Sequence, residues 1–232
     1  MRELPLIEHL GELRKRLLSI ITAIVLLFIL GIAISNSFIN KIQDDLVISG
    51  ITITAITPLE YFYTQIKIGL VIALVICFPF ILFHVLAFVK PGLQKRERIA
   101  ILYILPSILL LFLVGILFCY LVFLPIAIKF FSGLALQGNV VNLWTIDRFF
   151  NFILVSCLAF GLVFQLPLLL LVLSKLNLIS IDFLRKQRKY VYVLLFIIAA
   201  IITPPDAFTL VLAVVPLIAL YELSLLLIRV IK

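Results

Sequence analysis

The placement of basic residues between long apolar runs constrains this chain more than any other feature. Fifteen of its 19 Lys and Arg residues fall in four short stretches, at residues 2–16, 90–98, 175–189 and 229–232. Apolar runs separate these stretches, and the other side of each run carries almost no basic charge. Basic residues gather in the cytoplasmic segments of integral membrane proteins. The pattern therefore predicts a multi-pass membrane protein and gives the direction of each span.

Six apolar runs predict six transmembrane helices in a single domain, residues 1–232. A helix needs roughly 20 residues to cross a hydrocarbon core of about 30 Å. The fifth run is shorter and reaches only about 20 Å before the sequence Thr-Pro-Pro-Asp at 203–206 stops it. With six spans both termini share a side, and the basic stretches place that side in the cytoplasm. The predicted spans are about 17–34, 68–89, 99–124, 149–173, 190–202 and 208–228.

The composition of the chain limits which partners it can bind and which metals or cofactors it can hold. The chain is 65% apolar and 13% charged, far from a soluble domain, and its net charge is +8. Lysines and arginines on the cytoplasmic face of a lipid bilayer explain that charge better than nucleic acid does. The three cysteines lie in different apolar runs, and the two histidines are too scattered for a metal site. We expect no disulfide framework, no metal and no cofactor.

Motifs for catalysis are missing from the sequence. It contains no GxSxG, no HExxH and no paired intramembrane aspartates, so an intramembrane enzyme is not predicted. A small secondary solute or ion transporter is the alternative that stays open. Such a transporter needs several ionisable groups near the bilayer midplane, and the spans offer only Glu222 and the polar Gln165.

Prolines and apolar connections predict the shape of the bundle. Four prolines lie inside the spans, and each removes a helical hydrogen bond and bends its helix. We therefore expect a curved wall of helices. The external connections, residues 35–67 and 125–148, are apolar enough to pack over the bundle as a cap. The four prolines are Pro79, Pro106, Pro167 and Pro216.

Acidic residues on the cytoplasmic side are the candidate binding groups. Glu8 and Glu12 lie one helical turn apart, and their repulsion would be relieved by a cationic partner. From spacing alone, an ordinary pair between Glu12 and Arg16 at i, i+4 is favoured. Glu97 lies in the connection between the second and third spans. Its ordinary interpretation is an acid that complements the dipole at the start of the third helix.

Several motifs, in order along nearly the whole chain, resemble one family. The stretch His-Leu-Gly-Glu-Leu-Arg-Lys-Arg-Leu at 9–17 resembles the HLxELRKRL start of the TatC family, the receptor of the twin-arginine protein translocase. Residues 78–98 resemble that family's second span and first cytoplasmic loop. The third and last spans carry further matches: Gly115, Tyr120, Pro125, the 203–206 turn, Pro216 and Tyr221-Glu222.

The resemblance implies a fold and a function. The fold would be a concave, glove-like bundle of six helices with cytoplasmic N and C termini and two short final helices. Glu12 and Glu97 would bind the paired arginines of signal peptides on folded cargo, with Glu8, Arg14 and Arg98 beside them.

The resemblance also implies partners and a location. Single-span TatA- and TatB-type partners would associate along the fifth and sixth spans, and the chain would form a homo-oligomer within a larger complex. The membrane would be the cytoplasmic (inner) membrane, with a plastid thylakoid or an archaeal membrane left open.

Two positions depart from the family pattern. Gln165 stands where much of the family has glutamate, and an amide can share hydrogen bonds but cannot titrate. Leu210 occupies a position that is often polar in relatives. Glu222 either reaches the cytoplasmic surface or contacts a partner helix. The candidates for partner or intramembrane polar contacts are Gln165, Thr203, Asp206, Glu222 and Tyr120.

Overall fold

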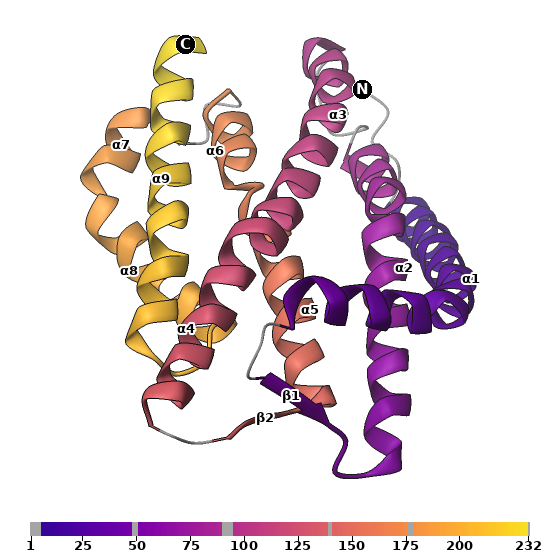
Figure 1. Cartoon of the computed structure of the whole chain (residues 1–232). Helices are drawn as coiled ribbons and strands as arrows, with labels where there is room; N and C mark the ends of the chain where they lie inside the picture. The colour runs from indigo at the N-terminus through magenta and orange to yellow at the C-terminus, as the bar shows by residue number, and fades with distance from the viewer. Residues whose placement is uncertain (1–5, 48–50, 90–94, 139–140, 176–178, 232) are drawn as a thin grey trace. The chain divides into compact units, whose positions relative to one another are not determined.

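The computed structural model describes residues 6–47, 51–89, 95–138, 141–175 and 179–231, and almost all of them are helical (Figure 1). Five helical segments of this described part are long and apolar enough to cross a membrane. Helix α8, Arg188–Ile202, has 15 residues and lies below that length. The count of six spans therefore stays a prediction. The five segments are Gly11–Leu46, Pro58–Val85, Pro106–Gln137, Ile146–Lys175 and Ala207–Arg229.

The chain forms two compact units. The first comprises residues 1–45 and 55–109 and holds nearly all of α1 (Leu6–Leu46), α2 (Pro58–Val89) and the start of α3 (Lys95–Phe118). At 41 residues α1 is about 62 Å long, roughly twice the thickness of a hydrocarbon core. The first part of the predicted external connection 35–67 is therefore a continuation of the same helix.

Two glycines set the distance between α1 and α2. A Cβ atom built on Gly31 would lie 2.5 Å from the carbonyl oxygen of Gly69, and one built on Gly69 would lie 2.9 Å from the backbone nitrogen of Ile32. Any side chain at either position would push the helices apart, so the backbones touch directly. One turn further, the Asn36 side chain accepts hydrogen bonds from Tyr61 and Gln65 of α2.

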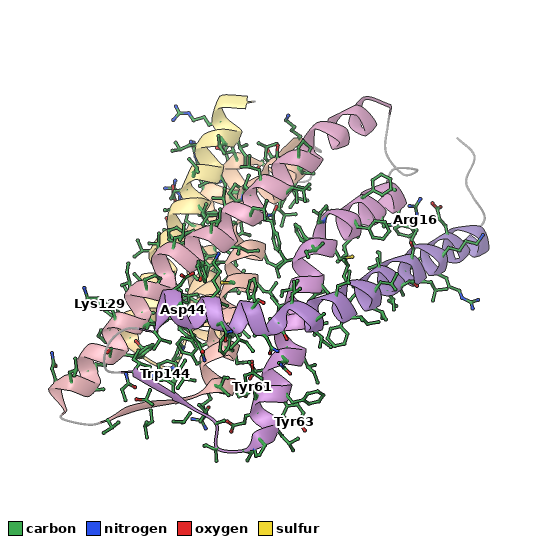
Figure 2. The ribbon with its side chains drawn as sticks, turned by 45° about the vertical axis from the view of Figure 1, so that its right-hand side comes forward. Arg16, Asp44, Tyr61, Tyr63, Lys129 and Trp144 are labelled. Atoms are coloured by element: carbon green, nitrogen blue, oxygen red, sulfur yellow. The ribbon has the colours of Figure 1, made fainter. Side chains whose placement is uncertain are left out.

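The second unit comprises residues 46–54 and 110–232. Its strands β1 (Ile51–Thr54) and β2 (Asn142–Thr145) pair in parallel, with Ile51 opposite Asn142. The two predicted external connections thus contact each other. Trp144 belongs to β2 (Figure 2), and its ring packs against Phe131, Phe149 and Phe152. The helices of this unit are the end of α3, the π turn η2 (Cys119–Phe123), α4 (Leu124–Gln137), α5 (Ile146–Val163), α6 (Leu166–Lys175), α7 (Ile181–Lys186), α8 and α9 (Ala207–Ile231).

Pro125 does not end the third predicted span. The helix passes through η2 and continues as α4, with Pro125 at the second position of α4. In the wider π turn the amide of Leu124 donates to the carbonyl of Cys119. A proline ring clashes with the carbonyl four residues earlier in a regular helix, and the π turn directly before Pro125 changes that spacing.

Pro167 divides the fourth predicted span. Helix α5 ends at Val163 and α6 begins at Leu166, with a turn at Phe164 and Gln165 between them. A proline ring clashes with the carbonyl four residues earlier in a regular helix, and for Pro167 that residue is Val163, where α5 ends. Close to the break, a Cβ on Gly115 would lie 2.9 Å from the Cα of Gly161, so α3 and α5 also touch through glycines.

Helices α8 and α9 form an antiparallel hairpin, in which α8 is short, as expected, but α9 has 25 residues and is long enough to span a membrane. Helix α9 lies between α6 on one side and α7 with α8 on the other, and it contacts all three (Figure 1). The turn at its start is capped by Asp206, whose carboxylate accepts from the amide and the hydroxyl of Thr209. Thr203 ends α8, and its hydroxyl donates to the carbonyl of Ala199 at 2.9 Å.

Candidate functional site

Glu12 already binds a guanidinium group. Arg16, one turn along α1, donates from Nε at 3.0 Å and from Nη2 at 2.5 Å to Oε1 of Glu12. The side chains are 30% (Glu12) and 23% (Arg16) exposed, so solvent and partners can reach the pair. The i, i+4 spacing predicted this contact, and both donors meet the same carboxylate oxygen. Arg14 on the same helix is exposed.

The other predicted cytoplasmic residues are placed only by their backbone. Glu8 lies in the first turn of α1, and Glu97 and Arg98 lie in the first turn of α3. Their side chains lie outside the described part of the structure. A helix N-terminus favours acids, which agrees with Glu97 as a residue that stabilises the start of α3. The role of these three residues in binding stays a prediction.

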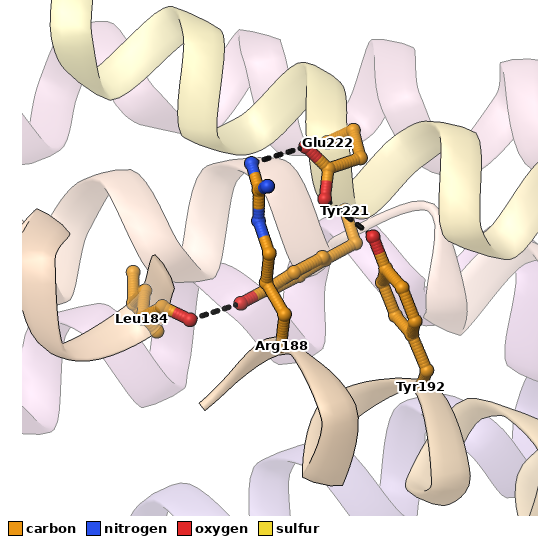
Figure 3. A network of polar contacts seen from close by, with 5 residues as sticks. All are labelled: Leu184, Arg188, Tyr192, Tyr221 and Glu222. Atoms are coloured by element: carbon orange, nitrogen blue, oxygen red, sulfur yellow. Dashed lines mark hydrogen bonds and ion pairs between the residues drawn. The ribbon is translucent and has the colours of Figure 1, made fainter. Parts of the chain in front are cut away.

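A second cluster of polar side chains joins α8 to α9. Arg188, at the start of α8, donates from Nη2 to Oε2 of Glu222 at 2.7 Å (Figure 3). The Tyr192 hydroxyl donates to Oε1 of the same carboxylate at 2.6 Å. Both carboxylate oxygens of Glu222 therefore have donors from the neighbouring helix. The Glu222 side chain is 33% exposed, and an ion pair at this exposure is worth less than a fully enclosed one.

Tyr221 extends this cluster to α7. Its side chain is buried, and its hydroxyl donates to the carbonyl of Leu184 at 2.9 Å (Figure 3). Ser180 caps the start of α7, and its hydroxyl accepts a hydrogen bond from the amide of Phe183. The adjacent residues Tyr221 and Glu222 thus hold α7 and α8, respectively, against α9.

The remaining predicted polar residues make contacts inside the chain. The Gln165 amide lies at the break between α5 and α6, with Nε2 at 3.4 Å from the carbonyl of Gly161. Tyr120 lies in the π turn and is half-buried. Thr203 and Asp206 cap the hairpin, as described above. In the part of the chain that the structure describes, no group of three His, Cys, Asp or Glu residues could hold a metal ion.

Sequence reasoning missed Arg188, Tyr192 and the link from Tyr221 to α7. The hairpin symmetry contains the signal: positions 188 and 222 are equally far from the turn at Pro205, so an antiparallel pair of helices brings them to the same level. The sequence also places one acid, Glu222, in the last span and several basic residues directly before the fifth span. Their opposite charges point to the same contact.

Comparison with known proteins identifies the family. The family model described as Sec-independent protein translocase protein (TatC) matches residues 8–216. The chain belongs to the TatC family. It is 36% identical to TatCy of Bacillus subtilis over 97% of this chain and 89% of that protein. It is 34% identical to TatC of Escherichia coli over 95% of this chain and 86% of that protein.

A solved structure has the same fold as this TatC-family chain. It is described as the crystal structure of the twin-arginine translocase receptor TatC, and it superposes with a TM-score of 0.86 at 34% identity. The alignment covers 94% of this chain and 98% of that one. The predicted class, an all-α integral membrane protein, is confirmed.

Family membership also decides between the functional alternatives. This TatC-family chain is a multi-pass membrane component of the Sec-independent protein translocase and works with other Tat subunits. It is not an enzyme, and the alternative of a small solute or ion transporter is not supported.

Proposed function

We propose that this TatC-family protein is the receptor of its translocase and binds the paired arginines of twin-arginine signal peptides carried by folded proteins. Glu12 and Glu97 are the two carboxylates that receive the arginines. Glu8, Arg14 and Arg98 shape the charge around them. The protein lies in the cytoplasmic membrane with both termini in the cytoplasm, as the distribution of basic residues predicts.

The contact between Arg16 and Glu12 carries this proposal. A carboxylate and a guanidinium are geometric complements, because planar donors meet two acceptor oxygens. Arg16 directs both of its donors to Oε1, so an incoming guanidinium binds Oε2 first and meets both oxygens once it displaces Arg16. The half-buried setting strengthens such a bond beyond an exposed pair, to about 1.5–3 kcal/mol. A solved relative described as the twin-arginine translocase receptor supports the same role.

The proposed partners are single-span subunits of the TatA and TatB type, which associate along α8 and α9. Large apolar side chains on these helices are exposed, as expected for surfaces that meet lipid or another membrane helix. Four of them are Val193, Leu194, Ile197 and Ile201 of α8. The complex would contain several copies of this chain.

A peptide titration tests the receptor role. Purified protein in lipid nanodiscs is titrated with a fluorescent twin-arginine signal peptide and with a control peptide that has lysines in place of both arginines. We expect the lysine peptide to bind at least tenfold more weakly, because an ammonium is a point charge without the planar fork. Equal affinity for the two peptides would exclude guanidinium recognition.

A further inference from the structure

Within the second unit, α9 and the segment around Phe118 leave an apolar groove between them. Its volume is about 400 Å³. Both walls belong to segments long and apolar enough to span a membrane, and the side chains of Val211 and Val215 are more than half exposed. The groove therefore opens toward the hydrocarbon of the bilayer. Its lining residues are Phe118, Phe208, Val211, Leu212, Val215 and Pro216.

The groove has the length of one lipid leaflet. From Phe208 to Pro216 the helix rises about 12 Å, and half of a hydrocarbon core is about 15 Å. Phe208 follows the turn at 203–206, which the charge distribution places on the external side. The groove thus runs from the external interface toward the middle of the bilayer, along the path of an acyl chain in the external leaflet.

Lys129 of α4 lies at the external end of the groove. The Phe208 ring stacks on Phe130 of α4, with centroids 4.0 Å apart, and Lys129 precedes Phe130. Lys129 is exposed (Figure 2), and no ion pair joins it to another residue in the described part of the chain. Ile126 and Leu134 near it on α4 are exposed apolar side chains. A lysine in such a setting directs its ammonium to the interface, where lipid phosphates lie.

We propose that the groove and Lys129 form a binding site for one anionic phospholipid of the external leaflet. An acyl chain fills the groove, and the headgroup phosphate binds Lys129. The exposed Lys129 beside the groove favours an anionic lipid over a partner helix, because the membrane-spanning part of such a helix is apolar and offers no negative charge.

Photocrosslinking tests the site. The protein is reconstituted into phosphatidylcholine bilayers that contain a trace of phosphatidylglycerol or phosphatidylcholine with a diazirine in one acyl chain, and labelled peptides are mapped by mass spectrometry. We expect phosphatidylglycerol to label residues 208–216 about fivefold more than phosphatidylcholine does, since one lysine near an anionic lipid is worth about that factor.

Variants separate the headgroup from the chain. Lys129→Gln should remove the preference for phosphatidylglycerol, while Lys129→Arg and the control Lys175→Gln, at the predicted cytoplasmic end of α6, should keep it. Val211→Trp fills the groove and should lower labelling by both lipids, while Val193→Trp on α8 should not. The proposal fails if both lipids label the groove equally in the unmodified protein. It also fails if Lys129→Gln leaves the preference intact, or if the groove is labelled no more than other lipid-facing helices because a protein helix occupies it.

Discussion

Arg188 and Glu222 lie 34 positions apart in the chain and form an ion pair with 2.7 Å between Nη2 and Oε2. The pair joins the start of α8 to α9, and Tyr192 donates to the other oxygen of the same carboxylate. Charge and hydrogen bonds thus hold the short helix α8 near its start, and the capped turn at 203–206 holds its other end.

Replacing Glu222 tests how much these contacts between α8 and α9 stabilise the protein. We expect Glu222→Ala to lower the free energy of unfolding by about 1–2 kcal/mol, because both Arg188 and Tyr192 lose their acceptor. Arg188→Ala should cost less than about 1 kcal/mol, since the pair is partly exposed. Thermal unfolding in detergent measures both. Equal losses for the two variants would mean that the Tyr192 bond adds nothing.

The glycine contact between α1 and α2 predicts a loss of stability that can exceed that of the Glu222 substitution. Gly31→Val should lower stability by about 1–3 kcal/mol, because its Cβ would overlap the Gly69 carbonyl and force the helices apart. Gly11→Ala on the same helix is the matched control. A Cβ at Gly11 meets nothing within 4 Å, so alanine should leave the melting temperature unchanged or raise it. A Gly31→Val protein as stable as the control variant would refute the direct backbone contact.

Asp206 is predicted to stabilise the hairpin as a helix cap. Asp206→Ala removes the acceptor for the Thr209 amide, which lies 2.7 Å away, and should cost about 0.5–2 kcal/mol. Asp206→Asn keeps an acceptor oxygen and should lose only the favourable charge at the helix start, about 0.3–1 kcal/mol. Chemical denaturation of the reconstituted protein distinguishes these values. If asparagine were as damaging as alanine, the charge rather than the cap would be the main contribution.

The fold was largely predictable because apolar length determines helices in a membrane. The predicted spans lie in helical segments, the fourth in both α5 and α6, and Pro79, Pro106 and Pro216 lie inside single helices. Pro167 and Pro125 behaved differently: the first accompanies a break, and the second follows a π turn that lets the helix continue. Local sequence marks a proline, but the packing of neighbouring helices decides whether the helix bends, breaks or widens.

Contacts between distant segments were harder to predict. The Arg16–Glu12 pair follows from helical spacing, which the sequence shows directly. The Gly31–Gly69 contact joins two helices and leaves no GxxxG pattern within either. Arg188 and Glu222 also lie on different helices, and they come into contact only because the two helices of the hairpin pack in this register. Proximity in both cases depends on tertiary packing, and only the equal spacing of residues 188 and 222 from the hairpin turn points to one of the two contacts.

The affinity of the twin-arginine peptide for Glu12 and Arg16 variants tests the receptor account most directly. Glu12→Gln should weaken binding at least tenfold, because the amide cannot form an ion pair with the signal arginine. Arg16→Gln should tighten binding about twofold, since it removes an internal competitor worth about 0.3–0.5 kcal/mol. Folded Glu12→Gln protein that binds the peptide as tightly as the unmodified protein would contradict the account.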